Sequence, residues 1–296
     1  MKRQTTSTLG VIKRKKSATA ARKKRTRRMS AYQYRFLQVE VSPEGYAVVR
    51  ICKEPVNSMS LELWSELDRC LHELEADSRN LKGVVLASGV RRPLFTAGND
   101  LNELYAKKTT KARFTDFWRA QTHFLAHLNS TKLVTVAAIK GACPAGGCIT
   151  ALSCDYRIMT EEKGYIGLNE VLIGLPVPKL WCKLMERNIG AKYAHSALMT
   201  GKMFKPREAL AVGLVDELAP EPDLLARAEG VIKKWAKLPH FGVSTTKRFL
   251  KDEIAREMFD FCDEEAEQTW GILTSPAIVG LMESYIRRLA KKKAKL

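Results

Sequence analysis

The chain has 296 residues, of which 45% are hydrophobic and 28% charged, a balance typical of soluble globular proteins that bury a substantial core. No apolar run approaches the roughly 20 residues that a membrane-spanning helix needs, which argues against a transmembrane segment. The formal net charge is +18, but twelve basic residues lie in 1–28 and six in 287–296, where there are no acidic residues. The excess charge therefore belongs to the two ends, because the segment between them is neutral.

The two ends have compositions of their own. Residues 1–28 combine Lys and Arg with Ser, Thr and Ala, which predicts a basic, disordered extension. Three interpretations stay open for it: an organelle presequence, an arm attracted to RNA or membranes, or a segment upstream of a functional start at Met29. Residues 291–296 form a basic tail ending in Ala-Lys-Leu, which resembles the address that a peroxisomal import receptor reads at a free C-terminus. The ends thus point to different compartments, the mitochondrial matrix or a peroxisome-type organelle.

The first third of the folded chain predicts strands and one amphipathic helix. Two alternating runs around Ser-Pro-Glu-Gly, within 36–51, indicate a β-hairpin. A helix then begins near Ser58 or Ser60, either of which can cap it. Residues 81–88 indicate a buried strand, followed by a loop at 93–104. The apolar stripe of the helix consists of Leu63, Leu67, Leu71 and Leu74.

Residues 111–130 predict a helix rich in aromatic side chains. His123 and His127 lie four residues apart and could share a metal ion, yet no carboxylate accompanies them in the sequence, so packing is the favoured interpretation. The seven cysteines form no CxxC pair and match no common zinc spacing, which favours free thiols in a reducing compartment. The sequence therefore predicts no metal site.

The stretch 133–174 carries the strongest signals for chemistry. An apolar run at 133–139 predicts a strand buried on both faces, and 141–148 is too rich in Gly and Pro to be strand. A short buried helix and another strand follow. The glycine pair before this helix leaves backbone N–H groups uncovered, which outlines a cradle for an oxyanion or a phosphate. Glu170 lies in an apolar segment and is expected to have a raised pKa suited to proton transfer, unless it is a surface Glu on a loop.

The order strand, strand, helix recurs, with strands near 84 and 134 and a helix near 147, which predicts stacked ββα units over 29–221. A short strand near 216 is expected to end this core. From 222 to 290 the sequence has helical periodicity only. The predicted organisation is therefore an extension at 1–28, an α/β core at 29–221, a helical region at 222–290 and a tail at 291–296.

These motifs resemble the crotonase (enoyl-CoA hydratase/isomerase) superfamily from about residue 34 to about residue 290. The most specific matches are GACPAGGC at 141–148, the following CDYRI, and GLNE at 167–170, supported by the segments at 55–67 and 93–104. Within the superfamily the chain is most similar to the mitochondrial type of Δ3,Δ2-enoyl-CoA isomerases. The resemblance implies an α/β fold, a crotonase-type spiral of ββα repeats, whose C-terminal helices cover the site and build a homotrimer.

The resemblance also implies a reaction on an acyl-CoA thioester without a cofactor or metal. The backbone amides of Asn99 and Gly147 would hold the thioester oxygen, and Glu170 would move a proton from C2 to C4. The residues expected to bind substrate are Ala97, Gly98, Asn99, Asp100, Leu101, Gly147 and Asn169. Asp100 is equally well interpreted as a helix cap.

Two alternatives stay open. Hydratases of this superfamily use a second carboxylate three residues after the position of Gly147, where this chain has Thr150, so the pattern favours an isomerase over a hydratase. A dienoyl-CoA isomerase would need a further carboxylate for which there is no clear candidate. The cationic ends also permit an RNA-binding protein, although nucleic acid is not the expected partner.

Overall fold

The computed structural model describes residues 32–293, and side chains up to residue 291. The predicted extension at 1–28 and the terminal Ala-Lys-Leu lie outside these residues. One long sheet has the strand order β1-β2-β3-β4-β6-β8, with β1 antiparallel to β2 and every other pair parallel. Its strands are β1 (Leu37–Ser42), β2 (Tyr46–Ile51), β3 (Gly83–Ser88), β4 (Val134–Ile139), β6 (Tyr156–Thr160) and β8 (Glu217–Ala219).

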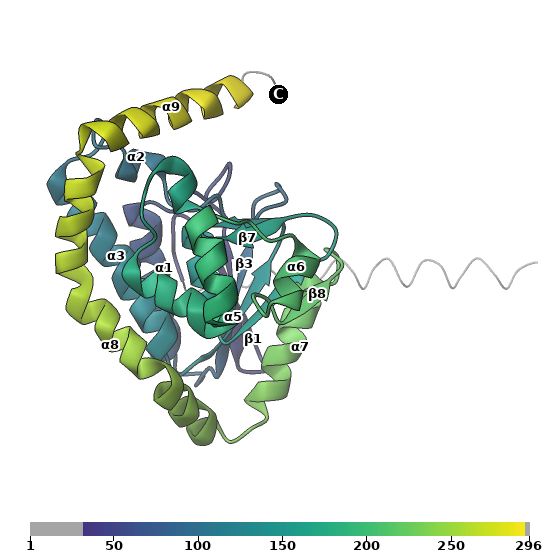
Figure 1. The fold of residues 1–296 in the computed structure, drawn as a ribbon. Coiled ribbons are helices and arrows are strands. Elements are labelled where there is room, and N and C mark those ends of the chain that lie inside the picture. The colour runs from purple at the N-terminus through teal and green to yellow at the C-terminus, as the bar shows by residue number, and fades with distance from the viewer. Residues whose placement is uncertain (1–31, 294–296) are drawn as a thin grey trace, which may run out of the picture. The chain divides into compact units, whose positions relative to one another are not determined.

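Helices cover both faces of this sheet (Figure 1). Helix α7 packs against one face of the sheet, where it contacts β3, β4 and β6. The other face belongs to the main core, to which the remaining large helices contribute. Among the described helices, none combines the length and the apolar character that a membrane crossing requires. The helices are α1 (Leu61–Glu75), α2 (Leu101–Leu104), α3 (Lys111–Ser130), α4 (Gly146–Ser153), the 3-10 helix η1 (Glu170–Ile173), α5 (Lys179–Thr200), α6 (Pro206–Ala211), α7 (Leu224–Ala236), α8 (His240–Leu273) and α9 (Pro276–Lys293).

The expected ββα recurrence is present as stacked turns of a spiral. Strand β4, the short strand β5 (Ala142–Pro144) and α4 form one turn, and β6, β7 (Tyr165–Gly167) and α5 form the next. Between these turns β4 pairs with β6, and β5 pairs with β7. Earlier turns repeat the scheme with single bridges, because Leu94 pairs with Ala142 and Met59 pairs with Asn99. The spiral therefore stacks the loops that precede α1, α2 and α4 beside one another.

One local prediction is wrong, and a second is correct only in the position at which the helix begins. The segment 141–148 was expected to contain no strand, but Ala142–Pro144 forms β5, because a parallel partner strand at β7 supplies its hydrogen bonds. Ser60 is the N-cap residue of α1, but its side chain makes no capping hydrogen bond. The Ser58 hydroxyl instead donates to Asp100 in the next turn of the spiral, at 3.0 Å.

A buried ion-pair cluster fastens α8 to the sheet. Lys247 Nζ lies 2.8 Å from Asp155 Oδ2 and donates to the Leu133 carbonyl at 2.8 Å, while Lys251 Nζ lies 2.9 Å from Asp155 Oδ1. Burial opposes ionisation of Asp155, but the two ammonium groups outweigh it and lower its pKa to about 2. Helix α8 then runs beside α3, and α9 follows it (Figure 1). This anchoring fixes the start of the C-terminal helices relative to the core.

Candidate active site

The loop before α2 is held by backbone hydrogen bonds that leave one amide free. The Met59 N–H donates to the Gly98 carbonyl at 2.9 Å, and the Asp100 N–H donates to the Met59 carbonyl at 2.9 Å. In a parallel bridge of this kind, the amide of the intervening residue points to the opposite side. That residue is Asn99, whose N–H has no hydrogen-bond acceptor within residues 32–293. The Asn99 amide is therefore available to a ligand.

The side chain of Asn99 holds this loop in place. Its Nδ2 donates to Gln121 Oε1 of α3 at 2.6 Å, and its Oδ1 accepts a hydrogen bond from Trp64 Nε1 of α1 at 3.2 Å. Trp64 and Gln121 are both fully buried. The Asn99 side chain thus connects the loop to two helices while its backbone amide stays free.

The start of α4 provides a second set of uncovered amides. The first intrahelical hydrogen bond runs from the Ile149 N–H to the Ala145 carbonyl at 3.0 Å, so the N–H groups of Gly146 and Gly147 have no partner inside the helix. Ala145 has a φ of 49°, an uncommon value for a residue with a side chain. Its own N–H donates to the Gly167 carbonyl of β7 at 2.9 Å, which fixes the turn.

The two loops touch where the glycines lie. A Cβ atom on Gly146 would come within 2.8 Å of Asn99 Oδ1, and one on Gly147 would come within 2.4 Å of Thr96 Cγ2. Gly98, with a φ of 83°, lies against Ala145 in the same way. A side chain at Gly146 or Gly147 would therefore displace the side chain of Asn99 or Thr96. The structure therefore brings the free amides of Asn99 and Gly147 onto adjoining loops.

Glu170 is buried in the turn that precedes α5. It begins η1, is only 9% exposed, and neither carboxylate oxygen has a hydrogen-bond partner among the described residues. Burial raises its pKa from 4.5 to about 7. Its charge is one of the causes that raise the pKa values of Cys148 on α4 and Cys182 on α5, so both thiols lie near it. The alternative of an exposed surface Glu is excluded.

The source of this burial differs from the expectation. The apolar segment around Glu170, which contains Leu168, Val171 and Leu172, was expected to raise the pKa of the carboxylate. Leu168 is buried, but Leu172 is 59% exposed and directed toward Gly201, so its part of the prediction is wrong. Helices α5 and α9 pack against this segment, and α9 contacts it through Leu281 at Gly174.

Thr150 occupies the position where a second carboxylate would lie in a hydratase. It is fully buried on α4, and its hydroxyl donates to the Gly146 carbonyl at 2.7 Å. Within the described residues, no neighbouring charged side chain contributes to the raised pKa of Glu170. Among the described residues, the structure thus offers one carboxylate here and no charged side chain that shifts its pKa.

Asp100 acts as a helix cap. Its Oδ1 accepts a hydrogen bond from the Asn102 N–H at 3.0 Å, and its Oδ2 lies 3.6 Å from Lys53 Nζ. Burial raises its pKa, but these hydrogen bonds and the Lys53 charge lower it further than burial raises it. The neighbouring Leu101 begins α2, and Asn169 is the half-buried residue before η1.

Another polar cluster escaped the sequence analysis. No carboxylate was expected near His127, yet His127 Nδ1 lies 2.9 Å from Asp68 Oδ1, and Nε2 lies 3.4 Å from Glu75 Oε2. Both acids come from α1, which packs against α3. His123 lies apart, with its ring against Phe259. The sequence did contain an indication of this cluster, since Asp68 and His72 lie four residues apart on α1. Only the packing of the helices shows that α3 faces them.

The stacked turns and the loops with free amides define a crotonase-type fold, as comparison with solved structures confirms. An enoyl-CoA hydratase from Bacillus halodurans has a TM-score of 0.76 at 22% identity, with 84% of this chain and 99% of that chain covered. The human mitochondrial delta3-delta2-enoyl-CoA isomerase has a TM-score of 0.83 at 35% identity, with 87% and 99% covered. The predicted α/β spiral with a C-terminal helical region is therefore correct.

The family follows from the sequence comparisons. Residues 42–270 match the model of the enoyl-CoA hydratase/isomerase family, and the chain belongs to this family. Enoyl-CoA delta isomerase 1, mitochondrial, from Homo sapiens is 36% identical over 261 residues, which cover 86% of this chain and 85% of that protein. The protein of the same name from Rattus norvegicus is 37% identical over 252 residues, covering 84% and 85%. The predicted family is confirmed.

Proposed function

We propose that this chain is a Δ3,Δ2-enoyl-CoA isomerase, which moves a 3-cis or 3-trans double bond of an acyl-CoA to the 2-trans position in the β-oxidation of unsaturated fatty acids. The observation that carries the proposal is the lone carboxylate of Glu170, buried without a charged neighbour among the described residues and with a pKa of about 7. The isomerase relatives at 36% and 37% identity support the same reaction.

The proposed mechanism needs one proton carrier. Glu170 as a carboxylate removes a proton from C2, and the electron pair moves into the thioester to give a dienolate. The resulting carboxylic acid returns the proton to C4, so the reaction consumes no water and leaves the enzyme unchanged. A pKa near 7 suits both steps, because neither the acid nor the base form is strongly disfavoured at neutral pH.

The amides of Asn99 and Gly147 would stabilise the dienolate oxygen. Backbone donors fixed by other contacts need no reorganisation as charge develops, and the loss of one such donor typically costs about 3 kcal/mol of barrier. Asp100 would contribute through its backbone, since its carboxylate is already engaged. The residues proposed to line the substrate are Ala97, Gly98, Asn99, Asp100, Leu101, Gly147 and Asn169. Coenzyme A is part of the substrate, and the reaction requires no further cofactor.

Hydration is disfavoured because it needs a second group to activate or hold water. Thr150 is buried and its hydroxyl is committed to the Gly146 carbonyl. Purified chain should therefore convert 3-cis- and 3-trans-enoyl-CoA to the 2-trans product much faster than it hydrates 2-trans-enoyl-CoA. Comparable rates of hydration would refute the isomerase proposal.

A labelled substrate tests the single-carrier mechanism directly. With deuterium at C2, part of the label should reappear at C4 in ordinary water, because the same carboxyl group removes and returns it. Glu170→Gln should abolish turnover, whereas Glu161→Gln, which changes an exposed glutamate, should keep it. Full activity in Glu170→Gln would assign the base elsewhere, and a series of acyl lengths would define substrate preference.

The proposed assembly is a homotrimer. Phe241, Phe249 and Leu250 on α8 are 82%, 85% and 61% exposed in the single chain, and apolar surface of this kind is commonly buried between subunits. Sedimentation would test it, and a monomer at micromolar concentration would contradict it.

The proposed location is a mitochondrial matrix or a peroxisome-type organelle. The mitochondrial names of the relatives favour the first, and a terminal Ala-Lys-Leu that an import receptor could read favours the second. Masking each end in turn in a localisation experiment separates these alternatives. RNA binding by residues 29–286 that persists at high salt would instead favour a nucleic-acid function.

A further inference from the structure

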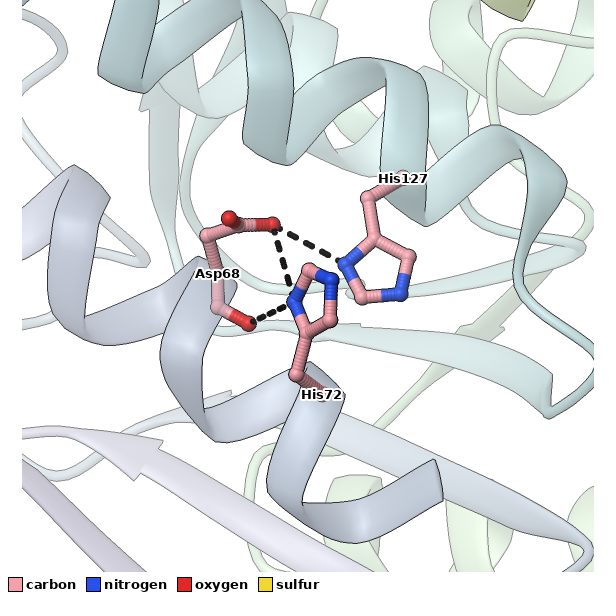
Figure 2. A group of neighbouring side chains, drawn as sticks. All are labelled: Asp68, His72 and His127. Carbon is pink, nitrogen blue, oxygen red and sulfur yellow. Dashed lines mark hydrogen bonds and ion pairs between the residues drawn. The ribbon is translucent and has the colours of Figure 1, made fainter. Parts of the chain in front are cut away.

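Two imidazoles and a carboxylate converge between α1 and α3 (Figure 2). Asp68 and His72 are one turn apart on α1, and His127 faces them from α3. His127 Nδ1 lies 2.9 Å from Asp68 Oδ1, and His72 Nδ1 lies 3.7 Å from the same oxygen. The two imidazole rings are 3.9 Å apart between centroids. Each of the three residues thus offers a donor atom to one small volume.

The spacing of these donors suits a small metal ion. One ligand atom from each residue lies within 4.8 Å of the other two. A tetrahedral zinc site with bonds of about 2.1 Å places its ligand atoms roughly 3.4 Å apart. The separations of 2.9 and 3.7 Å from Asp68 Oδ1 fall on either side of that value, and the two histidine ligand atoms lie within 4.8 Å of each other.

A second carboxylate orients the histidine that comes from α3. His127 Nε2 lies 3.4 Å from Glu75 Oε2, on the side of the ring away from Asp68. Glu75 is itself held by the hydroxyl of Thr131 and by the Lys132 N–H at 3.2 Å. Histidine ligands of metals usually donate their other ring N–H to such a carboxylate, which fixes the tautomer. His72 Nδ1 also lies 3.0 Å from the backbone carbonyl oxygen of Asp68, so a metal bound at Nδ1 replaces this local contact within α1.

We propose that Asp68, His72 and His127 bind one divalent transition-metal ion of the zinc class, with the fourth position open to water. Two imidazoles and one carboxylate favour Zn²⁺ over Mg²⁺ or Ca²⁺, which take oxygen ligands. Glu75 is the positioning residue behind His127. This site is independent of the proposed isomerase reaction.

The ion would act on the helix pair that supports the Asn99 loop. Trp64, one turn before Asp68 on α1, and Gln121 on α3 hold the Asn99 side chain. A metal joining α1 to α3 would oppose separation of these helices. Its role is structural, because none of its ligands contacts Asn99 or Glu170 among the hydrogen bonds and ion pairs of the described residues.

The test uses the full chain after chelator treatment and desalting. Zn²⁺ alone is titrated against a competing chromophoric chelator, and thermal unfolding is followed with and without the ion. We expect one Zn²⁺ per chain and a higher unfolding temperature with Zn²⁺, since the ion binds the folded state. His72→Ala changes a largely exposed side chain and should lower the affinity at least 100-fold. Glu75→Gln should lower it 10- to 100-fold.

His123→Ala is the matched control, because it removes an exposed histidine from the same helix, α3, whose ring packs against Phe259 of α8 and not against the cluster. Substitution with Co²⁺ adds a spectroscopic test, in which tetrahedral nitrogen and oxygen ligation gives visible bands without a thiolate charge-transfer band. Equal affinity in the wild type and His72→Ala would overturn the proposal and leave the cluster as an ion pair. So would an equal loss in His123→Ala, a thiolate band, or no stoichiometric binding.

Discussion

The burial of Glu170 predicts an effect on stability that is separate from catalysis. The folded chain holds this carboxyl with a pKa of about 7, against 4.5 for an unhindered glutamate. Between these two values the folded state binds a proton that the unfolded state has released. Stability is therefore lost as the pH rises through this window, and Glu170→Gln should avoid that loss because its amide does not ionise.

The size of the effect follows from the pKa difference. At about 1.4 kcal/mol per pKa unit, a rise from 4.5 to about 7 corresponds to about 3 kcal/mol of destabilisation once both states are ionised. The free energy of unfolding of Glu170→Gln minus that of the wild type should thus be about 2–3 kcal/mol larger at pH 8 than at pH 5. The cost of burying the unpaired amide is the same at both pH values and cancels.

Urea unfolding of both proteins at pH 5 and pH 8 measures this quantity, with m-values compared to verify the same transition. Glu161→Gln provides the control, since it changes an exposed glutamate and should give nearly the same difference at both pH values. If the difference for Glu170→Gln does not grow with pH, the carboxylate is solvated or paired in solution, and the reasoning about its pKa is refuted.

Three further outcomes are expected. The kcat/KM of the wild type should rise with pH to half its maximum near pH 7 and be about 100-fold lower at pH 5, because Glu170 is proposed to act as the base. A flat profile would contradict this proposal. Gly147→Ala should lower kcat about 100-fold, because the added methyl group pushes the Thr96 side chain aside. Thr96→Ser in the same chain should restore much of the activity, since it removes the methyl group that clashes. Without this rescue, the clash with Thr96 is not the cause of the loss. Lys247→Met should lower the free energy of unfolding in urea by roughly 3–5 kcal/mol, because the buried carboxylate of Asp155 loses one of its partners. Lys183→Met, which removes an exposed ion pair, should lower it by roughly 1 kcal/mol or less. Similar losses in the two variants would show that burial is not the cause.

Local sequence patterns were sufficient to predict several helices and strands of the fold. The helix over 111–130 matches α3 at both ends, because its Thr110 side chain caps the first turn and its apolar residues recur at helical spacing. The hairpin follows from alternation around a turn that ends with Gly45 at a φ of 82°. The strand Ala142–Pro144 was not predicted, because it forms only by pairing with β7. Glycine and proline around it are poor strand formers, so the local sequence does not indicate a strand.

The sequence by itself indicated the residues that are proposed to form the site: a glycine pair at a helix start, the Ala-Gly-Asn loop and a glutamate in an apolar segment. Only the tertiary structure decided what surrounds them. Helices α5 and α9 pack against η1, which begins with the buried Glu170, whereas the nearby Leu172 is exposed.

Packing likewise decided which polar side chains meet. The Asn99 side chain is held by Gln121 on α3 and by Trp64 on α1, which lie 22 and 35 residues from it in the sequence. His127 finds its carboxylates across the α1–α3 interface rather than along its own helix. The physical reason is that periodicity fixes the face on which a side chain lies, whereas burial, pKa and ligand geometry depend on what packs against that face.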